Sequence, residues 1–206
     1  MAHLIKMDSI TFLNAMMENK ENPDKFTFLV ISRDIKTNGE NKNVYPLDKL
    51  IPTPQVITTF IDEGYSDKYI KKYIKYLQTH NCRMLLATIA KMVVGEGTNV
   101  VLICSEHETQ YKYIDLIAKY LKKVYGIKAC SYKKFVKDPD KYDNGDLSEK
   151  KIDKIIKHEM AEIGVEYKAE KKSKKKDKKN KLNRFTLIQK VSVFFIAAGV
   201  PKRPLK

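Results

Sequence analysis

The run Asn99-Val-Val-Leu-Ile-Cys104 is the part of this 206-residue chain that most clearly predicts a fold. Its five successive apolar or small residues are typical of a strand buried on both faces, as in a parallel sheet. Two shorter runs, Phe26-Thr-Phe-Leu-Val-Ile31 and Ile127–Tyr132, favour further strands by their length and composition. We therefore expect a parallel sheet organised around residues 99–104.

Helix signals lie between and around these runs. Thr53-Pro54 offers a capping hydroxyl before a proline at the first helical position, and Ser66-Asp67 is a second such start. The order of strands and helices predicts right-handed crossovers in a small Rossmann-like, three-layer α/β domain with a mainly parallel sheet. Residues 33–52 are polar and predict a loop or a small hairpin. One further helix is expected to begin at Asp8 or Ser9. Three others are expected to span Cys82–Val94, Glu108–Tyr125 and Glu149–Ile163.

Positive charge is concentrated at the C-terminal end of the chain. The net charge is +15, yet residues 1–167 hold 26 basic and 23 acidic residues, a net charge of +3. Residues 168–206 hold 14 basic residues against Glu170 and Asp177, a net charge of +12. We expect an α/β domain at 1–167, a solvated lysine-rich linker at 168–181, and an apolar then basic segment at 182–206.

The lysine-rich arm indicates affinity for a polyanion. Lysine is a mobile point charge without the bidentate geometry of arginine, so the arm favours the DNA backbone over base recognition. The segment 182–206 either packs on the core or binds a partner. The residues expected to contact nucleic acid are Lys171, Lys172, Lys174, Lys175, Lys176, Lys178, Lys179, Lys181 and Arg184.

The cysteines indicate a reducing compartment. Cys82, Cys104 and Cys130 are odd in number and show no metal-binding spacing, so we expect reduced thiols, no metal and no cofactor. The first eight residues do not resemble a signal peptide. The apolar run 191–200 has about half of the roughly 20 residues that a membrane-spanning helix needs. We expect a cytoplasmic protein without a membrane partner.

One candidate for chemistry follows the central strand. Cys104 as nucleophile, Glu106 as acid and His107 as base would form a possible trio, since ligands bind at the carboxyl ends of parallel strands. Adjacent residues on one turn seldom face each other, however, and a cysteine that ends a buried strand usually serves packing. The favoured interpretation is a polar loop without catalysis.

Two other patterns have a structural and a functional interpretation. The acidic run 138–149 has the spacing of a calcium loop in part, but Tyr142 and Lys151 fall where oxygen ligands are needed, which favours a polar turn. The interleaved tyrosines and lysines of residues 65–76 could form a nucleic-acid surface. The helical spacing of Tyr69, Tyr73 and Tyr76 favours core packing instead.

Residues 47–121 resemble the YeaO-like uncharacterised family of small bacterial α/β proteins. The resemblance lies in Leu50-Ile-Pro52-Thr-Pro54 before a helix, in Tyr69-Ile-Lys-Lys-Tyr73, and in Gly97-Thr-Asn-Val-Val-Leu-Ile-Cys104-Ser-Glu106 before an amphipathic helix. It implies a Rossmann-like fold and no particular reaction. Some relatives carry a Cys-His-Arg group where this chain has Gln110-Tyr-Lys-Tyr113, so the resemblance gives no support to an activity tied to that group.

The whole chain also looks like small proteins of staphylococcal phages, in general character rather than by a motif. One such type binds the primary sigma factor of the host and inhibits transcription. This implies a non-enzymatic regulator that docks on host RNA polymerase or its sigma factor while the basic arm lies on adjacent DNA. The alternatives are a small enzyme acting on a nucleotide or nucleic acid at the Cys104–His107 turn, and a non-specific nucleic-acid-coating protein.

Overall fold

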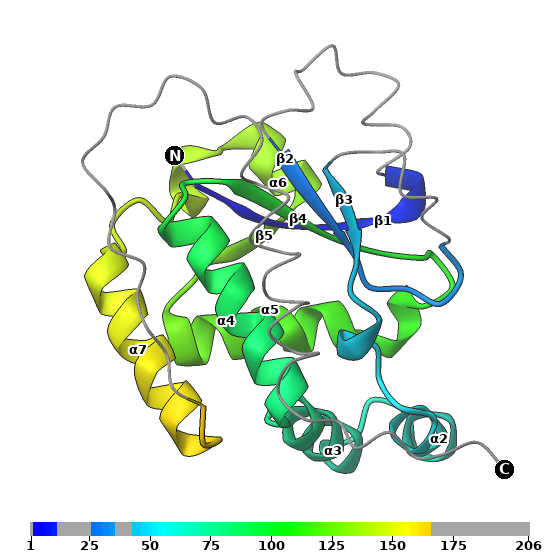
Figure 1. The fold of residues 1–206 in the computed structure, drawn as a ribbon. Coiled ribbons are helices and arrows are strands. Elements are labelled where there is room, and N and C mark those ends of the chain that lie inside the picture. The colour runs from blue at the N-terminus through cyan, green and yellow to red at the C-terminus, as the bar shows by residue number, and fades with distance from the viewer. Residues whose placement is uncertain (1, 12–25, 36–42, 166–206) are drawn as a thin grey trace, which may run out of the picture. The chain divides into compact units, whose positions relative to one another are not determined.

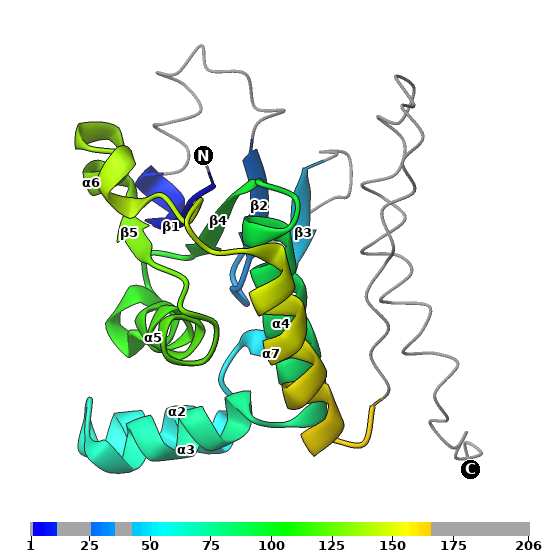
Figure 2. The same cartoon turned by 90° about the vertical axis from the view of Figure 1, so that its left-hand side faces the viewer.

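The computed structural model describes residues 2–11, 26–35 and 43–165. Five parallel strands form one sheet in the order β3-β2-β4-β1-β5 (Figure 1). The strands are β1 (Leu4–Asp8), β2 (Phe26–Val30), β3 (Val44–Pro46), β4 (Asn99–Cys104) and β5 (Ala129–Ser131). The predicted parallel α/β fold is confirmed, with helices on both sides of the sheet (Figure 2).

β4 is the central strand, as its continuous apolar sequence predicts. It pairs with β1 on one side, from Leu4 opposite Val100 to Asp8 opposite Cys104, and with β2 on the other. Val100 to Cys104 are all buried, because both faces of the strand are covered and both edges are paired. β1 was not predicted, because Lys6 and Asp8 interrupt its short apolar run.

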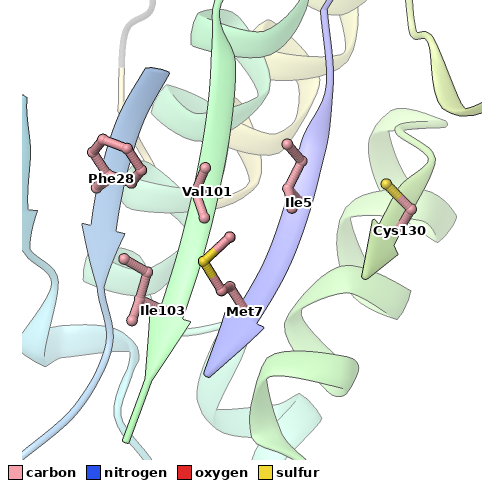
Figure 3. Packing of buried hydrophobic residues seen from close by; sticks show 6 residues of the cluster. All are labelled: Ile5, Met7, Phe28, Val101, Ile103 and Cys130. Carbon is pink, nitrogen blue, oxygen red and sulfur yellow. The ribbon is translucent and has the colours of Figure 1, made fainter. Parts of the chain in front are cut away.

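One face of the sheet carries a compact apolar cluster. Side chains alternate between the two faces of a strand, so Ile5 and Met7 of β1 share this face with Val101 and Ile103 of β4 (Figure 3). Phe28 and Cys130 complete the cluster from β2 and β5 (Figure 3). The short helix α6 (Tyr132–Lys137) contacts β1 and β5, and its Phe135 packs against the cluster.

Two layers of helices lie beyond the other face. α4 (His80–Val94) and α5 (Tyr113–Tyr125) contact β4, and α3 (Asp67–Leu77) packs on both of them (Figure 2). α2 (Pro54–Glu63) packs on α3. Tyr69 and Tyr73 of α3 are fully buried, which confirms core packing for these two tyrosines.

α7 (Glu149–Glu162) packs mainly on α4. Its Glu162 accepts a hydrogen bond from the Arg83 guanidinium at 2.6 Å, and its apolar face buries Ile152, Ile156 and Met160. Ser148 caps its first turn by accepting a hydrogen bond from the Lys151 amide. None of the helices in the described residues combines the length and the apolar character that crossing a bilayer requires.

Some element boundaries differ from the sequence predictions, and some predicted elements lie partly or wholly outside the described residues. Residues 44–46 form the edge strand β3 parallel to β2, which the predicted loop or small hairpin at 33–52 did not include, and residues 36–42 lie outside the described residues. The helix expected from Glu108 begins only at Tyr113, after a 3-10 turn at Thr109–Tyr111. The helix expected after Asp8 begins at residue 9, and most of its predicted length lies outside the described residues, as do the linker 168–181 and the segment 182–206.

The acidic run 138–149 joins α6 to α7 and hydrogen-bonds the residues just before two strands. Asn144 is buried, and its carboxamide Nδ2 donates to the carbonyls of Ala2 at 3.2 Å and Lys128 at 3.1 Å. Its Oδ1 accepts from the Lys128 amide at 2.7 Å, and the neighbouring Asp143 accepts from the Ala2 amide at 2.7 Å. The loop thus holds the residues that precede β1 and β5, which is a structural role.

We predict that Asn144→Ala lowers the free energy of unfolding by about 2–3 kcal/mol, because it leaves buried backbone groups without their partner. Urea denaturation followed by circular dichroism measures this. Asp146→Ala, two residues further on at an exposed position, is the matched control and should change stability by less than about 0.5 kcal/mol. Equal effects of the two substitutions would contradict the structural role of Asn144.

Candidate functional site

A cavity opens where the carboxyl ends of β1 and β4 meet. β1 and β4 are neighbours in the sheet. After β1 the chain continues to β2, which lies on one side of this pair, and after β4 it continues to β5, which lies on the other side. In open parallel sheets, the crevice at such a reversal is the usual place for a ligand. The cavity has a volume of about 340 Å³ and is lined from both strands and from the turn that follows β4.

The lining of this cavity, which we call the carboxyl-edge cavity, is of mixed charge. Three acids and three lysines line it together with hydroxyls, one thiol and the apolar parts of several side chains, so it offers both charged and apolar surface to a ligand. The side chains that line it include Lys6, Asp8, Thr11, Cys104, Glu108, Lys112, Tyr113 and Asp115.

Asp8 at the end of β1 orders the first turn that follows the strand. Its carboxylate accepts from the Thr11 amide at 2.7 Å and from the Thr11 hydroxyl at 2.9 Å. Lys6, two residues before Asp8 and on the same face of β1, forms a salt bridge with Asp115 of α5. The polar residues that interrupt β1 are therefore wall residues of the cavity.

Of the three acids that line the cavity, Glu108 accepts the most hydrogen bonds. Its side chain is buried, and its carboxylate accepts from the Arg33 amide at 3.3 Å, the Ser105 hydroxyl at 3.2 Å and the Tyr113 hydroxyl at 3.1 Å. Ser105 also lies 2.7 Å from a carboxylate oxygen of Asp34. These contacts join the segment after β2, the end of β4 and the start of α5.

The local backbone explains why Glu108 faces inward. The turn Thr109–Tyr111 is 3-10, and Lys112 has a left-handed φ of 51°. This break separates Glu108 from α5, so its side chain turns toward Ser105 and Tyr113. Tyr113 in turn lies 2.6 Å from the carbonyl oxygen of Ile31, beyond the end of β2.

The three residues considered for catalysis are not brought together. Cys104 lines the cavity with 5% of its surface exposed, whereas Glu106 and His107 are exposed and do not line it. Burial, and then the negative charges of Glu108, Asp8 and Asp115, raise the pKa of the Cys104 thiol to about 12. A thiol with this pKa is protonated at neutral pH and is a poor nucleophile.

A group of side chains with metal-binding chemistry lies elsewhere, on α7. His158, Glu159 and Glu162 are close enough to share an ion. Both carboxylates face Arg83, at 3.7 Å and 2.6 Å, so its guanidinium offsets part of their charge across the α4–α7 interface. This arrangement indicates a structural ion-pair cluster.

The lysines and the arginine expected to contact nucleic acid, Lys171 to Arg184, lie outside the described residues. The sequence alone did not identify Glu108, Asp8 and Lys6 as site residues, because their roles depend on strands and a turn that meet only in the fold.

Comparison with models of known protein families, with curated proteins and with solved structures gave no match to this chain.

We predict that Cys104 resists alkylation in the folded protein. With a pKa of about 12, its thiolate fraction at pH 7.5 is far below that of an ordinary thiol near 8.5, so iodoacetamide should react at least about 100-fold more slowly than with the unfolded chain. Peptide mapping by mass spectrometry, with and without guanidinium, measures this. Rapid, selective labelling of Cys104 in the folded protein would instead favour nucleophilic chemistry at this turn.

We predict that Glu108→Gln lowers the free energy of unfolding by about 1–3 kcal/mol, since a carboxamide cannot accept all three hydrogen bonds that the carboxylate accepts. Glu106→Gln, two residues earlier and exposed, is the control and should leave stability within about 0.5 kcal/mol. Thermal denaturation of the two variants compares them directly. A control variant as unstable as Glu108→Gln would argue against the inward role of Glu108.

Proposed function

We propose that this protein is a non-enzymatic regulatory binding protein that acts on nucleic-acid-bound partners. The observation that carries this proposal is the segregation of charge, with a net +12 in residues 168–206 and +3 in residues 1–167. A lysine-rich segment of this kind gives salt-sensitive affinity for phosphate backbones without base recognition. Specificity must then come from the α/β domain or from residues 182–206.

The carboxyl-edge cavity supports binding more than catalysis. Its thiol is held protonated, and the nearby His107 is exposed and does not line the cavity. Glu108 uses its carboxylate oxygens to hold Arg33, Ser105 and Tyr113, which favours a structural role for this acid. A cavity with these charged and apolar walls can receive a small ligand or a side chain of a partner protein.

The partner that we propose is the transcription machinery of a bacterial host, RNA polymerase or its sigma factor, with the basic arm on adjacent DNA. Binding to both would make the second contact intramolecular, so that the overall affinity exceeds that of either contact alone, and would inhibit transcription by occluding the DNA. We place this activity in the bacterial cytoplasm, and the three free thiols Cys82, Cys104 and Cys130 support a reducing compartment.

We predict that the full-length triple substitution of Lys174, Lys175 and Lys176 by Gln reduces the slope of log affinity for duplex DNA against log salt by about 2–3. Each lost phosphate contact removes about 0.9 from that slope. Fluorescence anisotropy over a salt series measures it. The matched control replaces Lys150, Lys154 and Lys157 of α7, all exposed, by Gln and should change the slope by less than about 1.

The experiment that tests the partner is an affinity pull-down from bacterial lysate with nuclease treatment, using the full chain and its Lys174/Lys175/Lys176→Gln variant. Retention of a polymerase subunit or the sigma factor by both proteins supports the proposal. Failure to retain any of them would exclude the transcription partner. Retention that disappears with nuclease or with the arm substitutions would instead identify a nucleic-acid-coating protein.

A further inference from the structure

A second hollow lies along the flank of α5, beside the carboxyl-edge cavity. Its volume is about 350 Å³, and we call it the α5 groove. It shares Lys6, Lys112 and Asp115 with the carboxyl-edge cavity, so the two hollows adjoin. The groove is lined by Lys6, Tyr65, Lys112, Asp115, Ala118, Lys119, Lys122 and Ala129.

The α5 groove is locally basic, although the α/β domain is nearly neutral as a whole. Four lysines line it against a single acid, Asp115, and that carboxylate is already paired with Lys6. Within the described part of the chain, Lys112, Lys119 and Lys122 have no carboxylate within salt-bridge distance and all three are exposed. Three positive charges therefore face the groove unbalanced.

The spacing of these lysines along the chain makes them a row. Lys119 and Lys122 are three residues apart and lie on one face of α5, and Lys112 directly precedes the helix. At a rise of 1.5 Å per residue, the row extends over roughly 15 Å. A row of this length can contact several phosphates of an extended strand, whereas a lone phosphate would use only one end of it.

Tyr65 adds an aromatic ring to the row. Gly64, with a left-handed φ of 66°, ends α2, and the turn presents Tyr65 beside α5. Lys112 Nζ lies 5.0 Å from the ring centroid and Lys119 Nζ lies 5.9 Å from it. Tyr65 is half-buried, unlike Tyr69 and Tyr73, and its ring lies among the lysines of the groove rather than in the core.

We infer that the α5 groove binds a segment of single-stranded nucleic acid, with phosphates on Lys112, Lys119 and Lys122 and a base stacked on Tyr65. Lysines beside an accessible aromatic ring are the combination that proteins use for single strands, and every base has a face that can stack. A duplex would use the lysines but not the ring. This site goes beyond the proposed function, which assigns nucleic-acid contact to residues 168–206.

The first test localises the contact in the full-length protein. A 15-nucleotide deoxythymidine strand carrying 5-iododeoxyuridine is cross-linked by light, and the cross-linked peptides are mapped by mass spectrometry. We expect a cross-link to the peptide that contains Tyr65, also when Lys174, Lys175 and Lys176 are replaced by Gln. Cross-links confined to residues 168–206 would overturn the inference and leave the proposed function of the arm intact.

The second test compares two charge-matched triple variants of the full chain by anisotropy with the deoxythymidine strand, a uridine strand and a duplex. Replacing Lys112, Lys119 and Lys122 by Gln should weaken single-strand binding about tenfold or more at 0.2 M salt and lower the salt slope by about 2. The Lys150/Lys154/Lys157→Gln control should stay within about threefold of the wild type. Equal loss in the two variants would overturn the inference, as would loss for the duplex alone. Tighter binding of the deoxythymidine strand would identify DNA as the ligand, and tighter binding of the uridine strand would identify RNA.

A third variant pair tests stacking separately from charge. Tyr65→Ala should weaken single-strand binding about fivefold or more, whereas Tyr65→Phe, which keeps the ring, should bind within about twofold of the wild type. Circular dichroism and the melting temperature confirm that the variants are folded. Equal affinities for Tyr65→Ala and Tyr65→Phe would exclude stacking on this residue.

Discussion

The parallel pairing of β4 with two neighbours is the constraint on which the rest of the structure depends. A buried strand must satisfy its backbone amides and carbonyls by pairing, and β4 does so with β1 and β2 at once. Because all three strands run in parallel, Asp8, Cys104 and the residues after Val30 meet at one edge. The chain leaves β1 and β4 in opposite directions at that edge, and the cavity lies between the two exits.

The fold class could be predicted because β4, β2 and most helix boundaries have strong local signals, such as the Ser66 and Ser148 caps and the glycine after α5. β1 and β3 could not be predicted for different reasons. β1 is interrupted by Lys6 and Asp8, whose polarity is explained only by the cavity they line. β3 has three residues and includes a proline, which is tolerated at a sheet edge but carries no strand signal.

The candidate site was predicted in position but not in its residues. The turn after Cys104 is at the carboxyl edge, yet the buried acid is Glu108 rather than Glu106, since a left-handed Lys112 separates Glu108 from α5. The tyrosines show a similar division: Tyr69 and Tyr73 are core residues, whereas Tyr65 stands among lysines. Periodicity predicts which residues share a helix face, but it does not predict which residues of a neighbouring helix contact that face.

The pairing of β1 also has a kinetic consequence. Leu4 is opposite Val100 in β4 and Ala129 in β5, so these contacts join residues 96 and 125 positions apart in the chain. Closing such long loops makes folding slower than it is for proteins with mainly local contacts. During synthesis, β1 leaves the ribosome long before its two partners. The apolar residues of β1 therefore remain unpaired until β4 and β5 have been synthesised. In this interval a chaperone or a neighbouring chain can bind them.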